Sequence, residues 1–240
     1  MKYRRVLLKL SGAAFAAERV AGLAPERVQY LAREVAGARD AEAQIAVVVG
    51  GGNFVRGREA AALGWPQVSV DYMGMLATVV NGLALRESLA AEGVPATVLS
   101  AFGVGECCER YSRRRALALL AAGEVVVFVG GTGRPLFTTD TAAALRAAEI
   151  EADLLLKATD VDGVYDRDPK GEGEARRFDT LTYGEVLGRD LKVMDASAAT
   201  LCRDHKIPTV VFCLYESGNI VKIMNGERLG TFVAGGEAPW

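Results

Sequence analysis

The sequence predicts an α/β protein: a three-layer αβα sandwich with a mainly parallel central sheet, formed by a single domain over residues 1–240. Short apolar runs rich in β-branched residues alternate along the chain with longer segments of helical periodicity. This alternation favours parallel strands joined by right-handed crossovers, with helices covering both faces of the sheet. Hydrophobic residues make up 50% of the chain and charged residues 24%, which is typical of a globular protein with one large core.

Six short apolar segments are predicted as buried strands of that sheet. They cover residues 6–10, 45–49, 96–99, 125–129, 153–156 and 209–213. Helices are expected between them, and the first is the clearest. Pro25 suits a first helical position, and Val28, Leu31, Ala32 and Val35 recur at offsets of three, four and seven. Residues 166–174, rich in Asp, Gly, Lys and Pro, are expected to form an exposed turn region between two halves.

Charge and composition point to small molecules as partners. The formal net charge of -2 provides no basic surface for nucleic acid, and we expect no membrane partner, because no apolar run approaches the ~20 residues of a membrane helix. The N-terminus lacks the features of a signal peptide. Four cysteines, with no CxxC pair among them, favour a reducing compartment, so we expect a cytoplasmic protein.

Three of the predicted strands are followed by loops that contain glycine: residues 9–12 (KLSG), 50–53 (GGGN) and 130–133 (GGTG). Ligands of open α/β sheets bind beyond the carboxyl ends of the strands, where glycines let backbone N–H groups approach an anion. One such loop is explained as well by a tight turn, but three after separate strands favour a phosphate site. Neither GxxxxGK[ST] nor GxGxxG occurs, so the site is not a standard P-loop or Rossmann fingerprint.

Polar residues beside these loops are candidates for phosphate binding. Lys9 closes an otherwise apolar strand, where a buried ammonium needs an anion; a lysine that reaches solvent is the alternative. Arg56 follows the second loop and offers a planar, multi-donor contact to phosphate. Thr138 and Thr139 offer hydroxyl donors, and Asp140 is expected to cap the helix that follows.

Six ordered motifs then resemble a known family. They are KLSG at Lys9, VGGGNFVRG at Val49, DYMGMLATVVNGLALR at Asp71, GTGRPLFTTDTAAALRA at Gly131, LLKATDVDGVYDRDP at Leu155 and LKVMDASA at Leu191. From about residue 3 to residue 233 the chain is similar to the bacterial UMP kinases of the amino-acid kinase superfamily. The resemblance implies an amino-acid kinase-like fold, and reversible transfer of the ATP γ-phosphate to UMP in pyrimidine nucleotide biosynthesis. It also implies magnesium with ATP as co-substrate, and a homohexamer.

The resemblance implies two lobes and a set of site residues. The N-terminal lobe, about residues 1–150, lies on the acceptor side, and the C-terminal lobe, about 151–240, on the nucleotide side. The implied ATP-binding residues are Lys9, Leu10, Ser11, Gly12, Gly52, Arg56, Thr159, Tyr165 and Asp168. The implied UMP-binding residues are Gly51, Asp71, Thr132, Gly133, Arg134, Pro135, Leu136, Phe137, Thr138 and Thr139.

Within these sets, the resemblance places Asp71 at the ribose hydroxyls. Lys9, Asp140 and Asp195 are implied as catalytic residues, with Asp195 or Asp140 near magnesium. From the sequence, Asp195 also fits a second role, as the first residue of an alanine-rich helix. Arg134 stands where the family commonly has asparagine, so the side-chain contact to the base is left open.

Two other functions and one assembly question stay open. A kinase of the superfamily that acts on a carboxylate or carbamate would need a lysine near Asp195, where LKVMDASA has the aspartate itself. A nucleotide-binding storage or regulatory protein without turnover is the second alternative. The helix expected over residues 72–89 carries apolar residues on more than one face. Either one of these faces contacts another subunit, or the whole helix is buried within its own chain.

Overall fold

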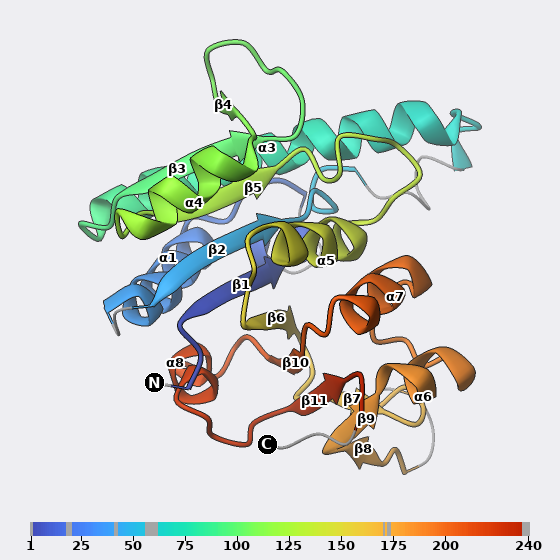
Figure 1. The fold of residues 1–240 in the computed structure, drawn as a ribbon. Helices are drawn as coiled ribbons and strands as arrows, with labels where there is room; N and C mark the ends of the chain where they lie inside the picture. Colours follow the sequence, from blue (N-terminus) through green and yellow to red (C-terminus); the bar gives the residue numbers. More distant parts are fainter. Residues whose placement is uncertain are drawn as a thin grey trace.

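The computed structural model describes residues 2–17, 21–40, 43–55, 62–169, 171 and 174–236, and confirms the predicted fold class (Figure 1). A nine-stranded sheet runs in the order β4-β3-β5-β2-β1-β6-β10-β11-β9. Its strands are β1 (Arg5–Leu10), β2 (Gln44–Val49), β3 (Ala96–Ser100), β4 (Glu109–Arg110), β5 (Val125–Val129), β6 (Leu154–Thr159), β9 (Thr180–Thr182), β10 (Thr209–Cys213) and β11 (Thr231–Ala234). Neighbouring strands pair in parallel, except β10 and β11, which are antiparallel. A separate antiparallel pair joins β7 (Val164–Tyr165) and β8 (Arg177–Phe178).

All six predicted strands are present: β5 and β10 have the predicted bounds, β1, β2 and β3 are each one residue longer, and one strand differs more. The segment expected at 153–156 is β6, which starts one residue later and continues to Thr159. Asp153 stays outside the strand because its side chain accepts hydrogen bonds from the backbone N–H groups of Arg4 and Arg5, both at 2.8 Å. The extension places Lys157 inside β6, directly opposite Lys9 of β1 in the register of the two strands.

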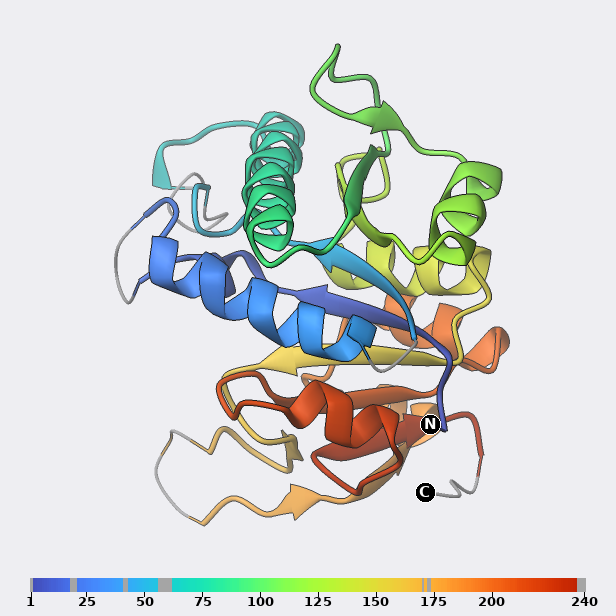
Figure 2. The ribbon, with the colours of Figure 1, turned by 90° about the vertical axis from the view of Figure 1, so that its left-hand side faces the viewer.

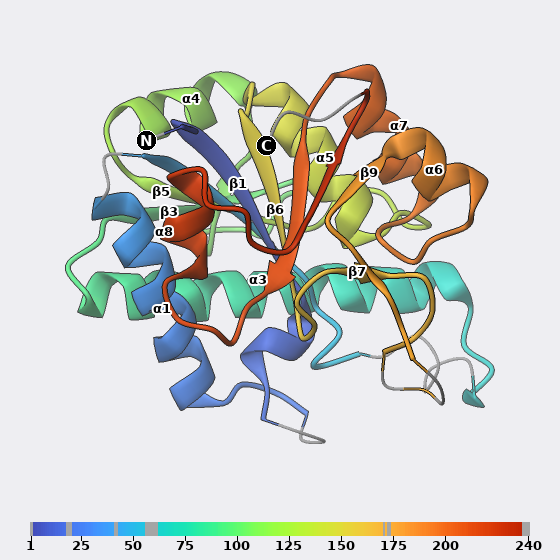
Figure 3. The ribbon, with the colours of Figure 1, turned by 90° about the horizontal axis from the view of Figure 1, so that it is seen from below.

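Helices form the two outer layers (Figure 2). The first layer contains α1 (Pro25–Asp40), α3 (Gln67–Ala91) and α8 (Asn219–Met224). The second contains α4 (Arg113–Ala121), α5 (Thr139–Glu149), α6 (Tyr183–Gly188) and α7 (Ala196–Asp204). In Figure 3, α1 and α8 lie on one side of β6 and β10, with α6 and α7 on the other. Alternate residues of the central strands supply the two cores, as in β1, where Leu8 faces the first layer and Leu7 the second.

The two clearest sequence-predicted helices behave differently. Helix α1 begins at Pro25 and buries Val28, Leu31, Ala32 and Val35, as predicted. Helix α3 begins five residues earlier than expected and has 25 residues. Within the described ranges it is the one helix long and apolar enough to span a membrane by length and composition, but the sheet explains its apolar character, because its inner face packs against β3 and β5.

The predicted turn region does not separate two halves of the chain. The described part of residues 166–174 lies between β7 and β8, well inside the C-terminal part of the chain. The chain instead enters its C-terminal part between α5 and β6, and β6 lies beside β1 in the middle of the sheet. One continuous sheet therefore joins the residues before and after position 150.

Candidate active site

The first two glycine loops touch at the carboxyl edge of the sheet. A methyl group added to Gly12 would lie 2.3 Å from the backbone nitrogen of Gly52, and one added to Gly50 would lie 2.8 Å from the nitrogen of Gly12. Only glycine permits so close an approach of two backbones. The predicted convergence of these two loops is therefore confirmed.

The third loop completes a cavity of about 210 Å³, which we call the acceptor cavity. In this loop Gly130, Gly131 and Gly133 all have positive φ angles, of 78°, 59° and 83°. The cavity is lined by the second and third loops and by α3, through Gly51, Gly52, Val55, Gln67, Val70, Asp71, Gly74, Met75, Thr78, Gly131, Thr132, Arg134, Phe137, Thr138 and Thr139. Seven of the ten residues implied for UMP are in this lining; Gly133, Pro135 and Leu136 are not.

Asp71 ties the segment between the third loop and α5 to helix α3. Its Oδ1 accepts a hydrogen bond from Gln67 Nε2 at 2.7 Å, and its Oδ2 accepts one from the backbone N–H of Leu136 at 2.7 Å. Leu136 has a φ of 70°, which is uncommon for a residue with a side chain. Leu136 therefore contributes by presenting its backbone to Asp71 in this strained conformation, while its side chain is exposed and does not line the cavity.

Asp140 lies between two lysines behind the acceptor cavity. Its Oδ1 is 2.8 Å from Lys9 Nζ, and its Oδ2 accepts a hydrogen bond from Lys157 Nζ at 2.6 Å. The three side chains are 12%, 17% and 14% exposed for Lys9, Asp140 and Lys157. Two cations share one carboxylate, so one positive charge is left to attract a phosphate.

The electrostatics of this triad follow from burial and pairing. Burial alone would raise the pKa of Asp140, but the ammonium groups of Lys9 and Lys157 outweigh it and lower that pKa. Burial lowers the pKa of Lys157, and the nearby carboxylate of Asp140 opposes this shift. The attraction between the two ammonium groups and the Asp140 carboxylate is strong because these groups are in contact.

Two sequence interpretations change at this point. Asp140 is not the helix cap: Thr138 is, since its Oγ1 accepts from the backbone N–H groups of Asp140 at 3.0 Å and Thr141 at 3.4 Å. This leaves the Asp140 carboxylate for the lysines. Lys157 was missed, although it carries the same signal as Lys9, a lysine within an apolar strand, because the strand was predicted to end at residue 156.

Asp195 caps α7 and also contacts the first turn of α5. Its Oδ1 accepts from the backbone N–H of Ala198 at 2.9 Å, which confirms the capping role. The hydroxyl of Thr141 donates to the same carboxylate at 2.9 Å, and the hydroxyl of Thr138 donates to it as well. Asp195 thus lies beside the acceptor cavity, through Thr138, while Lys157 donates to the carbonyl of the nearby Val193.

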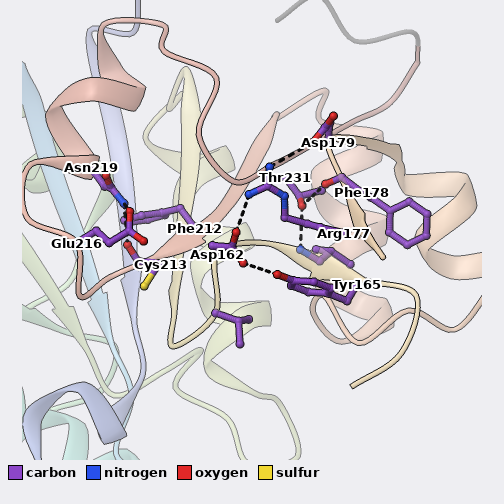
Figure 4. Close-up of polar contacts among 12 residues, drawn as sticks. Asp162, Tyr165, Arg177, Phe178, Asp179, Phe212, Cys213, Glu216, Asn219 and Thr231 are labelled. Atoms are coloured by element: carbon purple, nitrogen blue, oxygen red, sulfur yellow. Dashed lines mark hydrogen bonds and ion pairs between the residues drawn. The ribbon is translucent and has the colours of Figure 1, made fainter. Parts of the chain in front are cut away.

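A second cavity, of about 380 Å³, opens on the C-terminal side of the triad, and we call it the nucleotide cavity. Lys157, Thr159, Tyr165 and Asp168 are among its lining residues. The Tyr165 hydroxyl donates to Asp162 at 2.5 Å, and Arg177 donates to the other Asp162 oxygen at 2.7 Å, so the ring is fixed in place (Figure 4). Sequence patterns gave no independent reason for Tyr165 or Asp168, since YDRDP is also an ordinary exposed turn.

A third cavity, of about 420 Å³, links Lys9 and Ser11 to Lys157 and Thr159 on the other side of β6. Leu10 is fully buried, and its carbonyl accepts from the Gly50 N–H at 2.8 Å, so it supports the loops from below. Arg56 lies outside the described residues. Lys157 of the triad therefore lines both the second and the third cavity.

Comparisons with known proteins agree with this geometry. Residues 4–213 match the Amino acid kinase family. The chain is 49% identical over 235 residues to a uridylate kinase of Xanthomonas oryzae pv. oryzae, covering 98% of both chains. The chain belongs to the amino acid kinase family. It is also 51% identical over 236 residues to a chloroplastic uridylate kinase of Arabidopsis thaliana, covering 98% of this chain and 70% of the relative.

Solved structures of the family have the same fold as this kinase. The crystal structure of a UMP kinase from Bacillus anthracis superimposes with a TM-score of 0.95 at 35% identity, covering 99% of this chain and 98% of that one. A UMP kinase from Ureaplasma parvum gives a TM-score of 0.90, also at 35% identity, with 98% and 100% covered. The predicted membership and fold are confirmed, while the roles assigned to single residues stay predictions.

The carboxylates of the described residues do not form a cage for a metal ion. Within the described ranges no group of three or more His, Cys, Asp or Glu side chains is placed to hold one. Both oxygens of Asp140 contact lysines, and both oxygens of Asp195 accept hydrogen bonds. The expectation that Asp195 or Asp140 stands near magnesium stays a prediction.

Proposed function

We propose that this kinase transfers the γ-phosphate of ATP to UMP, reversibly, giving ADP and UDP. The observation that carries the proposal is the buried Lys9–Asp140–Lys157 triad: Lys157 lines the nucleotide cavity, and Asp140 directly follows Thr138 and Thr139, which line the acceptor cavity. Relatives about half identical over nearly the whole chain are uridylate kinases. Pyrimidine nucleotide biosynthesis is the process that needs this reaction.

Phosphoryl transfer needs positioning and charge neutralisation more than covalent chemistry. UMP attacks through a phosphate oxygen that is already ionised near neutral pH, so no general base is required. Lys9 and Lys157 lie where charge accumulates on the transferred group, and Asp140 fixes the separation of the two ammonium groups. The backbone N–H groups of the glycine loops add neutral donors around the phosphates.

Magnesium, in this proposal, enters with ATP as part of the substrate. Mg²⁺ commonly keeps several waters and binds substrate phosphates with few protein carboxylates. Such binding fits a site whose two nearest carboxylates are already engaged. Asp195 then acts on the geometry of α7 and of Thr138 rather than as a ligand.

A lysine near Asp195 does not separate a carboxylate or carbamate acceptor from a nucleotide acceptor, as the sequence analysis expected it to. A lysine was expected near Asp195 only for such enzymes, yet Lys157 is bonded to Val193, two residues away. The feature that favours a nucleotide acceptor is Asp71, which faces the acceptor cavity and can accept ribose hydroxyls. A storage protein without turnover would have no need for a buried, charged triad.

We further propose a cytoplasmic homohexamer. All four cysteines are free, which fits a reducing compartment. The outer face of α3 is apolar and exposed, with Val68, Tyr72, Leu76 and Val80 spaced four residues apart. Such a stripe is typical of a subunit contact.

An ADP-release assay with UMP, CMP, dUMP, and carboxylate and carbamate acceptors tests the function. We expect turnover with UMP and much less with CMP or dUMP. Equal turnover of CMP and UMP would contradict the narrow specificity, and turnover only with an acyl acceptor would contradict the nucleotide acceptor.

A further inference from the structure

Helix α3 presents two buried polar side chains, Thr78 and Asn81, to the loops of the acceptor cavity. Their exposed fractions are 4% and 0%, and they lie on a helix face that also buries Val79 and Leu85. Buried amides and hydroxyls destabilise a fold unless they are hydrogen-bonded. The hydrogen-bond partners of Thr78 and Asn81 therefore indicate the role of these two side chains.

Asn81 holds the second glycine loop. Its Nδ2 donates to the Gly50 carbonyl at 2.7 Å and to Asn53 Oδ1 at 2.8 Å. Asn53 Nδ2 in turn donates to Asn81 Oδ1 at 3.0 Å and to the Gly22 carbonyl at 2.9 Å. Both ends of the loop are thus fastened to one side chain of α3.

Thr78 holds the third glycine loop in the same way. Its Oγ1 accepts from the backbone N–H of Gly130 at 2.7 Å and donates to the Met75 carbonyl at 2.6 Å. The single hydroxyl proton is used within α3, so none is left for a ligand. Gly82 permits this contact, because a methyl group there would lie 2.3 Å from Cγ1 of Val129, the residue before Gly130.

We propose that Thr78 and Asn81 are positioning residues, through which α3 sets the separation of the 50–53 and 130–133 loops for the phosphate of UMP. The proposal rests on the proposed function. Asn81 has no exposed surface and does not line the cavity, so it acts on UMP only through Gly50 and Asn53. Thr78 lines the cavity, but its hydroxyl proton is used within α3, so it acts on UMP through Gly130.

Four variants test the proposal. Thr78→Val keeps the shape and removes the hydroxyl, Thr78→Ser restores the hydroxyl, and Asn81→Leu keeps the branching and removes both polar atoms. Thr209→Val is the matched control, since Thr209 is fully buried and its hydroxyl lies 2.7 Å from that of Tyr183, at the amino end of β10. Its loss lowers the Tm without touching either loop.

We expect Thr78→Val and Asn81→Leu to raise the KM for UMP by about tenfold, the effect of losing one anchored hydrogen bond. Thr78→Val leaves the KM for ATP unchanged, and Thr78→Ser restores the KM for UMP. Thr209→Val changes neither KM. If Asn81→Leu does not fold, the two Thr78 variants carry the test.

Amide hydrogen exchange supplies a readout that does not depend on activity. In Thr78→Val, the amides of residues 130–133 exchange faster than in the wild type, and in Asn81→Leu those of residues 50–53 do. Variants that lose as much Tm as Thr209→Val but keep wild-type loop exchange and wild-type KM for UMP would overturn the positioning role. A wild type that phosphorylates no UMP would overturn the proposed function instead, and loop exchange would still decide the positioning.

Discussion

The site is organised, residue by residue, around Asp140. Lys9 and Lys157 come from neighbouring strands at matched register, so their ammonium groups reach the same carboxylate from two sides. Like charges this close are stable only with an anion between them. Asp140 supplies one negative charge at all times, and the phosphate in transfer supplies more.

Removing either ammonium should therefore slow the chemical step. We expect Lys157→Met and Lys9→Ala each to lower turnover by about 100-fold or more, because loss of an electrostatic stabiliser costs ~2.7 to 4 kcal/mol in the transition state. Steady-state turnover at saturating ATP and UMP measures this. Lys222→Met, on the exposed surface of α8, is the control and should keep full turnover. Full turnover in Lys157→Met would remove Lys157 from the mechanism.

Asp140 should link stability to pH. Its lowered pKa means that it stabilises the fold above its usual value of 3.8, and that this stabilisation is lost as pH falls through the folded-state pKa. At neutral pH, Asp140→Asn leaves two buried ammonium groups unpaired and should cost about 3 to 5 kcal/mol. Thermal unfolding from pH 3 to pH 8 tests this: the difference between wild type and variant should be constant above about pH 5 and shrink below pH 4. A difference independent of pH would show that packing, and not charge, explains the loss.

Asp195 has a structural role in the fold, and Asp195→Asn separates it from a catalytic one. Asparagine keeps an acceptor for the Ala198 N–H and caps helices as well as aspartate does, so we expect little change in Tm. A catalytic role predicts a large fall in turnover from loss of the charge. Near-normal turnover would leave Asp195 as a cap that also holds Thr138 and Thr141.

Single-residue predictions from sequence succeeded where the residue type was unusual for its place. Lys9 stood out at the end of an apolar strand. Lys157 did not, because its strand was predicted to end at residue 156, one residue before it. Asp140 was read as a cap because Asp is a common cap, but the cap two residues earlier, Thr138, frees it. Which lysine pairs with which carboxylate depends on strand register, and local sequence does not carry that.

Among the elements, the central strands were predictable and the edge strands were not. Strands β1, β2, β5, β6 and β10 are continuous apolar runs, which parallel strands buried on both faces require. The edge strands β4 and β9, and β11 beside β9, have two to four residues each, and such short segments show no clear period. The antiparallel pairing of β11 with β10 is a contact between two distant segments, so the sequence of either segment alone does not predict it.

The second glycine loop offers a matched pair of substitutions. A methyl group at Gly51 would lie 2.3 Å from the Gly74 carbonyl oxygen of α3, whereas one at Gly52 meets no atom within 4 Å. Gly51→Ala should therefore push the loop from α3 and lower the Tm, with a cost of about 1 to 3 kcal/mol. Gly52→Ala should keep the Tm but raise the KM for ATP, if phosphate oxygens approach its backbone. Unchanged kinetics in Gly52→Ala would place the phosphates elsewhere.

At the scale of the whole molecule, the outer face of α3 is apolar and exposed to solvent. Val68, Tyr72, Leu76 and Val80 are 42%, 48%, 50% and 43% exposed, and they recur every four residues along the helix. The inner face of the same helix is fully engaged with the sheet and the two glycine loops. The sequence predicted apolar residues on more than one face, and the structure shows which of them face outward.

Association through this stripe is the basis of the proposed hexamer, and Leu76→Glu tests it. Leu76 is the most exposed of the four stripe residues, so a charge there would be buried without a partner in any contact that uses the stripe. We expect light scattering at micromolar concentration to show an oligomer for the wild type. The same measurement should give a smaller molar mass for Leu76→Glu. Because Leu76 is exposed, the variant chain should still fold, with wild-type far-UV circular dichroism. Leu23→Glu, at a residue 40% exposed and outside α3, is the control and should keep the assembly of the wild type. A monomeric wild type would contradict the assembly, and a Leu76→Glu variant that assembles like the wild type would move the subunit contact to another face.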